Sequence, residues 1–263
     1  MDNRKKSWIN ALLLAATLVI NTLGAFGVIN QLSQKQISDM YPTLITPSPF
    51  VFSIWSVIYS LLIVSMIVMI IKKTDLYYKR AADKLTVLFP LSCLLNIAWV
   101  IAFSYIQIEL SVIFILGLVL TLALICKQLL HIQEDGRWLL PLSFGLYTGW
   151  LFIATVVNIS AALVKLHWNG FGLADEVWAA IILIVAVLLA IGVQLNIRNA
   201  VFPLPVAWAY FGIYQILKAK EGFGGQFGFL QVISLAGMTV LIVSSAIQIY
   251  RNNFSLLPSL KND

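Results

Sequence analysis

Long apolar stretches alternate with short polar segments along the whole chain. Eight runs contain no Asp, Glu, Lys, Arg or His; they cover residues 8–32, 49–71, 85–108, 110–126, 138–164, 177–197, 199–217 and 226–250. A helix needs about 20 apolar residues to cross the about 30 Å hydrocarbon core of a bilayer. We therefore expect about eight transmembrane helices. The fourth run is short and only Arg198 separates the sixth from the seventh, so six or seven spans also agree with the pattern.

The runs predict helices rather than strands. A membrane β-barrel would show segments of about ten residues that alternate apolar and polar positions, whereas these runs are apolar on every side. Only helices satisfy their own backbone hydrogen bonds in lipid in that way. Prolines stand near the start of several runs, where the missing N–H costs little; they are Pro49, Pro90, Pro141, Pro203 and Pro205. The predicted fold class is an all-α polytopic membrane helix bundle.

Composition excludes the soluble classes of protein. The chain is 60% hydrophobic and only 11% charged, against about 25% charged residues in soluble domains. Too few polar groups remain to cover a globule in water, which rules out a soluble enzyme and a nucleic-acid binder. The predicted surroundings are a lipid bilayer.

The net charge of +6 lies in the loops and predicts the orientation. With eight spans, one side collects 13 of the 17 basic residues, including those at positions 4–6, 72, 73, 79, 80, 84, 127, 137, 198, 251 and 261. Lys35, Lys165, Lys218 and Lys220 fall on the other side. By the positive-inside rule both termini are cytoplasmic. We expect an integral protein of a bacterial cell membrane.

Candidate catalytic and metal-binding groups are scarce. Cys93 and Cys126 fall within or at the end of runs and form no disulfide or zinc pattern. His131 and His167 are predicted on opposite faces of the membrane, so they cannot share a metal. No hydrolase or zinc-protease motif occurs, and no run contains the ionisable group that proton-coupled carriers use. We predict no catalytic residue, no metal and no resident cofactor, while a porphyrin remains a candidate ligand.

Aromatic and amide residues inside three runs recur at helical spacing. Residues 41–62 read YPTLITPSPFVFSIWSVIYSLL, which places Phe52, Trp55 and Tyr59 on one helix face. The third run contains LNIAWVIAF and the fifth contains LYTGWLFIATVVN. Their stripes are Asn96, Trp99 and Phe103 in the third run, and Tyr147, Trp150, Ala154 and Asn158 in the fifth.

These motifs resemble the translocator protein family, also called tryptophan-rich sensory proteins. That family has a Y-P-x-L stretch with prolines before F-x-x-x-W-x-x-x-Y, then L-N-x-x-W, then W-x-x-x-A-T-x-x-N. The resemblance implies a five-helix bundle that binds a tetrapyrrole or a sterol-like molecule under a cap, here residues 33–48. It implies the ligand-binding residues Tyr41, Pro42, Pro47, Trp55, Tyr59, Asn96, Trp99, Phe103, Tyr147, Trp150, Ala154 and Asn158. No histidine or cysteine is placed for an axial bond, so a metal-free porphyrin fits better than haem.

The resemblance divides the chain and leaves three functions open. Residues 1–168 are expected to form the five-helix bundle and residues 169–263 a three-helix transmembrane extension. The first function is a binding or sensory protein for a planar hydrophobic molecule. The others are a facilitative transporter of an uncharged hydrophobic solute and a light-dependent porphyrin-degrading enzyme. Alternatively, the tryptophans do not bind a ligand but pack the helices together or lie in belts at the membrane interfaces. A homodimer is also left open, since no strong small-xxx-small motif specifies a dimer face.

Overall fold

A computed structural model of the chain describes residues 3–259, with side chains from residue 8 onward. Every regular element within that range is helical. The α-helices are α1 (Asn3–Ala25), α2 (Gln34–Asp39), α3 (Ile54–Ile71), α4 (Leu76–Leu85), α5 (Leu88–Ser104), α6 (Ile108–Leu130), α7 (Leu139–Lys165), α8 (Asp175–Ile197), α9 (Pro203–Lys218) and α10 (Gly228–Arg251). Two short 3-10 turns, η1 (Pro49–Ser53) and η2 (Gly170–Gly172), precede α3 and α8. The prediction of an all-α fold is confirmed.

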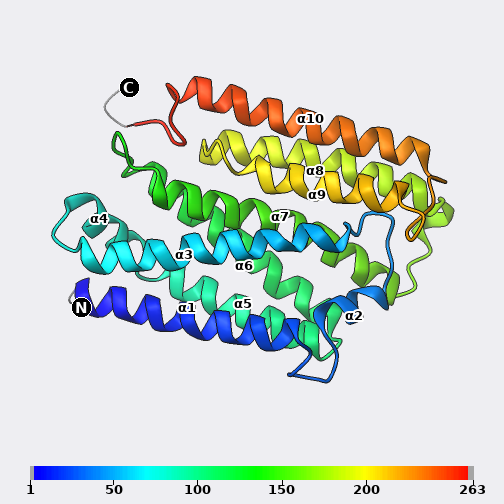
Figure 1. The fold of residues 1–263 in the computed structure, drawn as a ribbon, viewed down its shortest axis with the longest axis horizontal. Helices are drawn as coiled ribbons and strands as arrows, with labels where there is room; N and C mark the ends of the chain where they lie inside the picture. Colours follow the sequence, from blue (N-terminus) through cyan, green and yellow to red (C-terminus); the bar gives the residue numbers. More distant parts are fainter. Residues whose placement is uncertain (1–2, 260–263) are drawn as a thin grey trace.

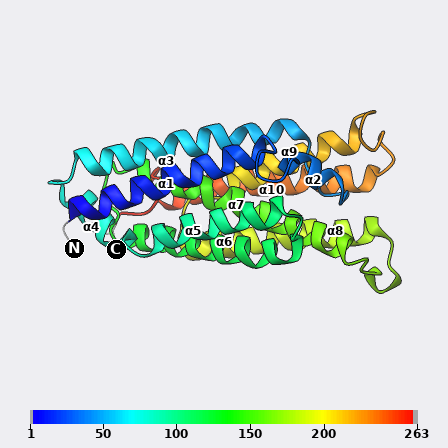
Figure 2. The same cartoon turned by 90° about the horizontal axis from the view of Figure 1, so that it is seen from below.

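The long helices lie side by side, and consecutive ones run in opposite directions (Figure 1). Seen from below, α1 and α3 form one side of the bundle and α5, α6 and α8 the other, with α7 between them (Figure 2). Helix α7 packs against α3, α6, α8 and α9. It also has the largest buried share of the candidate membrane spans. It is the central helix of the fold.

Each of the eight apolar runs becomes a helix, but not all of these helices are long enough to cross a bilayer. Six helices pass a test of length and composition: α1, α3, α6, α7, α8 and α10. Helices α4 and α5, which bend by 50° at their junction, pass the same test when they are counted together, which gives up to seven spans. Helix α9 has 16 residues, or about 24 Å at 1.5 Å per residue, because residues 199–202 of its run form a turn before Pro203. The described residues thus give a polytopic bundle of six to seven spans.

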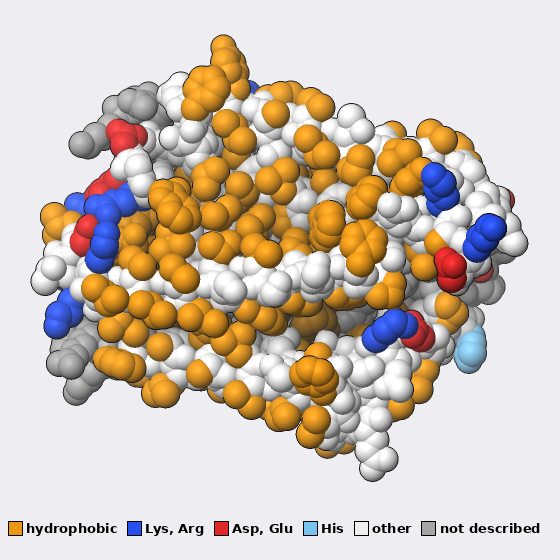
Figure 3. Space-filling view, viewed as in Figure 1, with side chains coloured by type: hydrophobic (Ala, Val, Ile, Leu, Met, Phe, Trp, Pro, Cys, Tyr) orange, Lys and Arg blue, Asp and Glu red, His pale blue; other side chains and the backbone are white. Residues whose placement is uncertain are grey.

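The apolar surface of the bundle is the surface that a membrane covers. Large hydrophobic side chains are exposed along the spans, as in α8, where Leu188 and Leu189 are 64% and 55% exposed. Figure 3 shows hydrophobic side chains across the middle of one face, with the charged side chains gathered toward its two ends. Soluble proteins rarely expose a continuous apolar surface of this extent. The chain is therefore an integral membrane protein.

The directions of the helices place most of the basic segments at one end of the bundle, as the sequence predicts. The start of α1 and the end of α10 lie at the same end of the bundle, together with α4 and the α6–α7 loop (Figure 1). Lys35 of α2, Lys165 at the end of α7 and Lys218 at the end of α9 lie at the other end. Lys261 is outside the described residues, and the side chains of residues 4–6 are not described. Which end faces the cytoplasm stays a prediction.

One apolar core joins α1 and α3–α7 to α8, α9 and α10. It includes Leu14 of α1, Phe144 of α7, Leu183 of α8, Tyr210 of α9 and Leu241 of α10. Gly149 brings α7 especially close to the start of α9, since a Cβ added there would meet the backbone of Phe202. The division of the chain at residue 168 remains a prediction.

Helix α4, which the apolar runs do not include, is held by an ion pair at the basic end. Asp75 caps the helix by accepting a hydrogen bond from the Tyr77 backbone N–H at 2.9 Å. The Arg137 guanidinium lies 2.9 Å from the other oxygen of the same carboxylate. Partial burial raises the pKa of the Asp75 carboxyl, but the hydrogen bonds from Arg137 and Tyr77 outweigh it and hold that pKa below its ordinary value.

This ion pair predicts a stability that depends on pH. A carboxyl with a lowered folded-state pKa stabilises the fold above its unfolded pKa, about 3.9, and loses that contribution as pH falls through the folded value. We expect Asp75→Asn, which can still cap α4, to lower stability by up to about 1 kcal/mol at pH 7. The difference should shrink below about pH 4. Thermal unfolding in detergent between pH 3 and 7 measures it.

The control for this prediction is Asp39→Asn, which removes an ion pair of the same kind at the other end of the bundle. Asp39 pairs with Lys35 four residues earlier on α2, and both side chains are more than half exposed. Such a pair contributes little in water. An equal loss of stability in the two variants would contradict the role of Asp75.

Candidate ligand-binding site

Helix α3 presents two of the predicted aromatic residues as a stack. Trp55 and Tyr59 are four residues apart and so lie on one helix face. Their ring centroids are 4.8 Å apart and their planes differ by 19°. Both side chains are half-buried, so the stack forms an edge of the helix interface rather than its centre.

Helix α7 brings its own aromatic residues against this stack. The Trp55 ring meets Tyr147 at 6.1 Å and Trp150 at 6.2 Å between centroids, both edge to face. Phe52 of η1 approaches Trp150 at 5.7 Å. Edge-to-face contacts at such distances are favourable because the positive ring edge meets the negative ring face. The predicted residues of the second and fifth runs therefore form one aromatic cluster, made of Phe52, Trp55, Tyr59, Tyr147 and Trp150.

Buried amides connect the aromatic cluster to α5 and α1. The Asn96 side chain is fully buried and its Nδ2 donates to the Tyr147 hydroxyl at 2.9 Å. The Asn96 Oδ1 accepts a hydrogen bond of 2.6 Å from Nδ2 of Asn21 on α1. Polar links between helices of this kind hold membrane bundles together. The amide chain thus fixes Tyr147 in its position beside Trp55.

Trp99 and Asn158 form a second polar link, between α5, α6 and α7. The Trp99 indole N–H donates to Asn158 Oδ1 at 2.8 Å, and Asn158 Nδ2 donates to the Ser111 hydroxyl at 3.0 Å. All three residues are buried. This link occupies the polar atoms of both predicted residues, so in this structure neither has a free polar atom to offer to a ligand.

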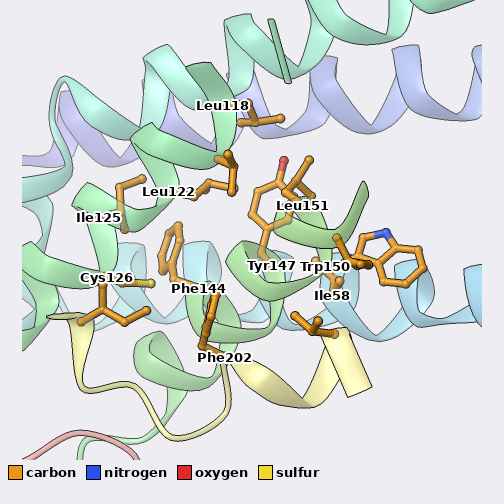
Figure 4. Packing of buried hydrophobic residues seen from close by; sticks show 14 of the residues in the cluster. Ile58, Leu118, Leu122, Ile125, Cys126, Phe144, Tyr147, Trp150, Leu151 and Phe202 are labelled. Atoms are coloured by element: carbon orange, nitrogen blue, oxygen red, sulfur yellow. The ribbon is translucent and has the colours of Figure 1, made fainter. Parts of the chain in front are cut away.

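Two buried donors of the aromatic cluster have no hydrogen-bond partner within the described part of the chain. They are Nε1 of Trp150, whose side chain is 2% exposed, and the hydroxyl of Tyr59. An unpaired buried donor costs about 1–3 kcal/mol, and most such groups in proteins are satisfied. Figure 4 shows Tyr147 and Trp150 leaving α7 in different directions, the first toward the side chains of α6. The cluster therefore presents two donors and aromatic faces, with no charged group.

The remaining predicted residues lie outside this cluster. Tyr41 and Phe103 pack in a small separate core around Ile37, where α2 meets α5. Pro47 is buried against Gly212 of α9, and the nearby Ser48 N–H donates to the Gly212 carbonyl at 3.1 Å. Ala154 packs against the main core.

A cavity of about 280 Å³ lies next to the predicted cap, beside the end of α7. Its walls are Pro42–Ile45 of the loop, the last turns of α7, the first turns of α8 and Phe223. Trp168 and Trp178 line it with ring centroids 4.8 Å apart. Pro42 is the only residue of the predicted site in its wall. The sequence motifs do not predict this cavity.

Two further contributors, Asn21 and Ser111, were missed as well. Phe52 was placed on the face of Trp55 and Tyr59 but was not among the predicted ligand-binding residues. Asn21 had a signal, since it is a lone amide within the first apolar run. Nothing in the spacing along α6 distinguishes Ser111 from serines that bond only their own helix.

Taken together, the fold and this cluster define a polytopic membrane protein with an uncharged aromatic core around its central helix. A comparison with models of protein families matches residues 7–247 to the TSPO-like protein family. Because the match covers most of the chain, the protein belongs to this family, as the motifs predicted. The matched region also extends into α10, so the similarity is not confined to the first five spans. Comparisons with curated proteins and with solved structures gave no match.

Proposed function

We propose that this protein binds a planar hydrophobic molecule, such as a tetrapyrrole, at the aromatic cluster between α3 and α7. Membership of the TSPO-like family supports a membrane protein of the binding or sensory type. The observation that carries the proposal is the pair of buried donors without partners, Trp150 Nε1 and the Tyr59 hydroxyl. A ligand whose acceptor atoms paired with these donors would remove the free-energy cost of leaving them unpaired.

The composition of the cluster supports a flat and largely uncharged ligand. Tryptophan and tyrosine rings provide stacking area, and their polar atoms orient what they bind. The cluster contains no acid or base, so a ligand with a charge at its centre would lose its hydration without compensation. Acidic substituents of a porphyrin would have to stay outside the cluster.

Access from the membrane is compatible with the position of the cluster. Trp55 and Tyr59 are half-buried, and Phe52 is 45% exposed on the surface. Figure 3 shows a recess on this face between α1 and α3, the helix that carries the Trp55–Tyr59 stack. In the structure the cluster is closed by its own ring contacts, so binding requires these side chains to move apart.

The test is a titration of the purified protein in detergent with protoporphyrin. Quenching of the tryptophan fluorescence measures the binding. Trp150→Phe and Tyr59→Phe each remove one donor and keep the ring. We expect each to weaken binding by about 3-fold to 10-fold, the value of one neutral hydrogen bond. The control is Trp138→Phe, since Trp138 is 57% exposed and lies outside the cluster. Equal affinities in all the variants would contradict the site.

No observation on the described residues favours a transporter or a light-dependent enzyme. Both would also act on a bound hydrophobic molecule, so the same variants would affect them. Illumination of the complex and uptake into vesicles distinguish these activities from binding. The binding site is therefore the first property to establish.

A further inference from the structure

A second cavity lies at the basic end of the bundle, far along the helices from the proposed ligand site. It has a volume of about 370 Å³ and opens between the ends of α8 and α10. Arg198 and Arg251 line it, with Gln248, Asn252, Asn253 and Leu195 among its other walls. Unlike the cavity beside α7, it is lined mainly by polar side chains.

Neither arginine of this cavity has an acidic partner among the described residues. At the same end of the bundle, Arg80 pairs with Glu134 and Arg137 pairs with Asp75. Arg198 and Arg251 take part in no such pair, and both are exposed. Two cations that share one cavity repel each other, and an anion between them would remove that repulsion.

The arginines are not needed to cap the helices that carry them. The backbone N–H groups of Asn252 and Phe254 bond the Gln248 and Ile249 carbonyls at the end of α10. The Arg198 N–H bonds the Gln194 carbonyl at the end of α8 at 2.7 Å. Helix C-termini carry a partial negative charge and repel anions, so any anion here must be attracted by the guanidinium groups themselves.

Buried amides hold the wall of the cavity in place. Asn252 is 3% exposed, and its Nδ2 donates to the Arg198 carbonyl at 2.9 Å and to the Leu256 carbonyl at 3.1 Å. Gln248 Nε2 donates in turn to Asn252 Oδ1 at 2.8 Å. Arg198 itself has a left-handed backbone with φ of 50°, which is uncommon for a residue with a side chain. The ends of α8 and α10 are thus fixed relative to each other before anything binds.

The cavity stands where the headgroups of a bilayer lie. It is at the ends of two membrane-spanning helices, and the Leu195 side chain in its wall is 54% exposed. An acyl chain would meet this leucine and the apolar surface of α8 beyond it. Basic pockets between membrane helices are a known form of site for anionic lipid headgroups.

We propose that this cavity binds a phosphate group, that of an anionic phospholipid headgroup. A guanidinium matches two phosphate oxygens with two parallel N–H donors. Arg198 and Arg251 hold the phosphate, the side chain of Asn253 is a further polar contact, and Leu195 contacts the glycerol end of an acyl chain. Inorganic phosphate has the same oxygens but no acyl chain, so it is the alternative source of the same chemistry.

The test measures thermal unfolding of the full chain in neutral detergent with three additions. These are phosphatidylglycerol, phosphatidylcholine and inorganic phosphate. We expect phosphatidylglycerol to raise the unfolding temperature in a saturable way, and phosphatidylcholine to leave it unchanged. The variant Arg198→Gln/Arg251→Gln should bind phosphatidylglycerol roughly 10-fold more weakly or worse, since each charged hydrogen bond is strong.

The control variant is Lys73→Gln/Lys79→Gln, which removes two exposed charges at the same end and should keep the full shift. Arg251→Lys keeps the positive charge but loses the two parallel N–H donors of the guanidinium. We expect phosphatidylglycerol to raise its unfolding temperature by an intermediate amount, and this variant tests the site even if the double variant fails to fold. A shift with inorganic phosphate equal to that with phosphatidylglycerol would support the cavity and assign it to free phosphate. An equal phosphatidylglycerol shift in both double variants, or no shift in the natural protein, would overturn the proposal.

Discussion

Replacing Gly149 by alanine is expected to destabilise the protein strongly. An added Cβ would lie 2.0 Å from the Phe202 carbonyl oxygen and 3.2 Å from Cδ of Pro205. The first of these atoms belongs to the backbone, at the start of α9, and cannot rotate away as a side chain can. Helices α7 and α9 would have to separate. Overpacking costs about 1–3 kcal/mol. We expect Gly149→Ala to lower the free energy of unfolding by the upper end of that range or more.

The matched control for this prediction is Gly192→Ala on α8. A Cβ at Gly192 would meet nothing within 4 Å, and the residue is exposed in the middle of a helix. Alanine there should be neutral or should stabilise by about 0.5–1 kcal/mol through its helix propensity. Thermal unfolding in one detergent compares the two variants. If Gly149→Ala unfolded at the same temperature as Gly192→Ala, the docking of α9 on α7 would be wrong.

Much of this fold can be predicted from the sequence, because a membrane demands long apolar helices. The eight apolar runs correspond to α1, α3 and α5–α10. Helix α4 escaped that search because it reads LYYKRAADKL, with charged residues on one side and Tyr77, Tyr78 and Ala81 buried on the other. Its signals were the capping Asp75 and the spacing of its apolar residues. Pro90 marks the break between α4 and α5, because it has no N–H to donate to the Thr86 carbonyl four residues earlier. The angle of the bend depends on packing.

Within the site, spacing along one helix predicts a face but not the partner of that face. It correctly grouped Trp55 with Tyr59, and it placed Tyr147 and Trp150 on the same helix. It could not show that Asn96 bonds Tyr147 while Trp99, three residues later, bonds Asn158 instead. Those choices depend on the rotation of α5 between its neighbours, which is set by contacts far apart in the sequence.

The packing of the loop against α9 shows the same limit. The resemblance implied that residues 33–48 cap the ligand, yet Phe50 and Val51, just beyond them, pack on the C-terminal helices. The Trp208 indole N–H donates to the Val51 carbonyl at 3.0 Å, and the Phe50 ring meets Trp208 edge to face at 5.3 Å. A five-helix template has no α9, so it cannot predict these contacts. Any opening of the aromatic cluster through η1 would therefore involve α9.

The second large effect is expected from the polar link between α5, α6 and α7. Asn158→Leu keeps the size of the side chain but leaves the Trp99 indole N–H buried without its acceptor at 2.8 Å. Ser111 retains its own bond to the Ile108 carbonyl, so the unpaired indole accounts for most of the loss. We expect Asn158→Leu to lower the free energy of unfolding by about 1–3 kcal/mol.

A double variant tests whether that loss comes from an unpaired donor or from packing. Trp99→Phe removes the indole N–H, so in Trp99→Phe/Asn158→Leu no donor is stranded. Replacing both partners of a buried hydrogen bond by apolar groups costs far less than removing one. The double variant should therefore be more stable than the sum of the two single losses predicts, by an interaction energy of about 0.6–1.7 kcal/mol, the range for hydrogen bonds between membrane helices. Unfolding of the four proteins in one detergent gives this value. Strictly additive losses would mean that Asn158 and Trp99 contribute through shape alone, and the polar link would then not determine how α5 is rotated against α7.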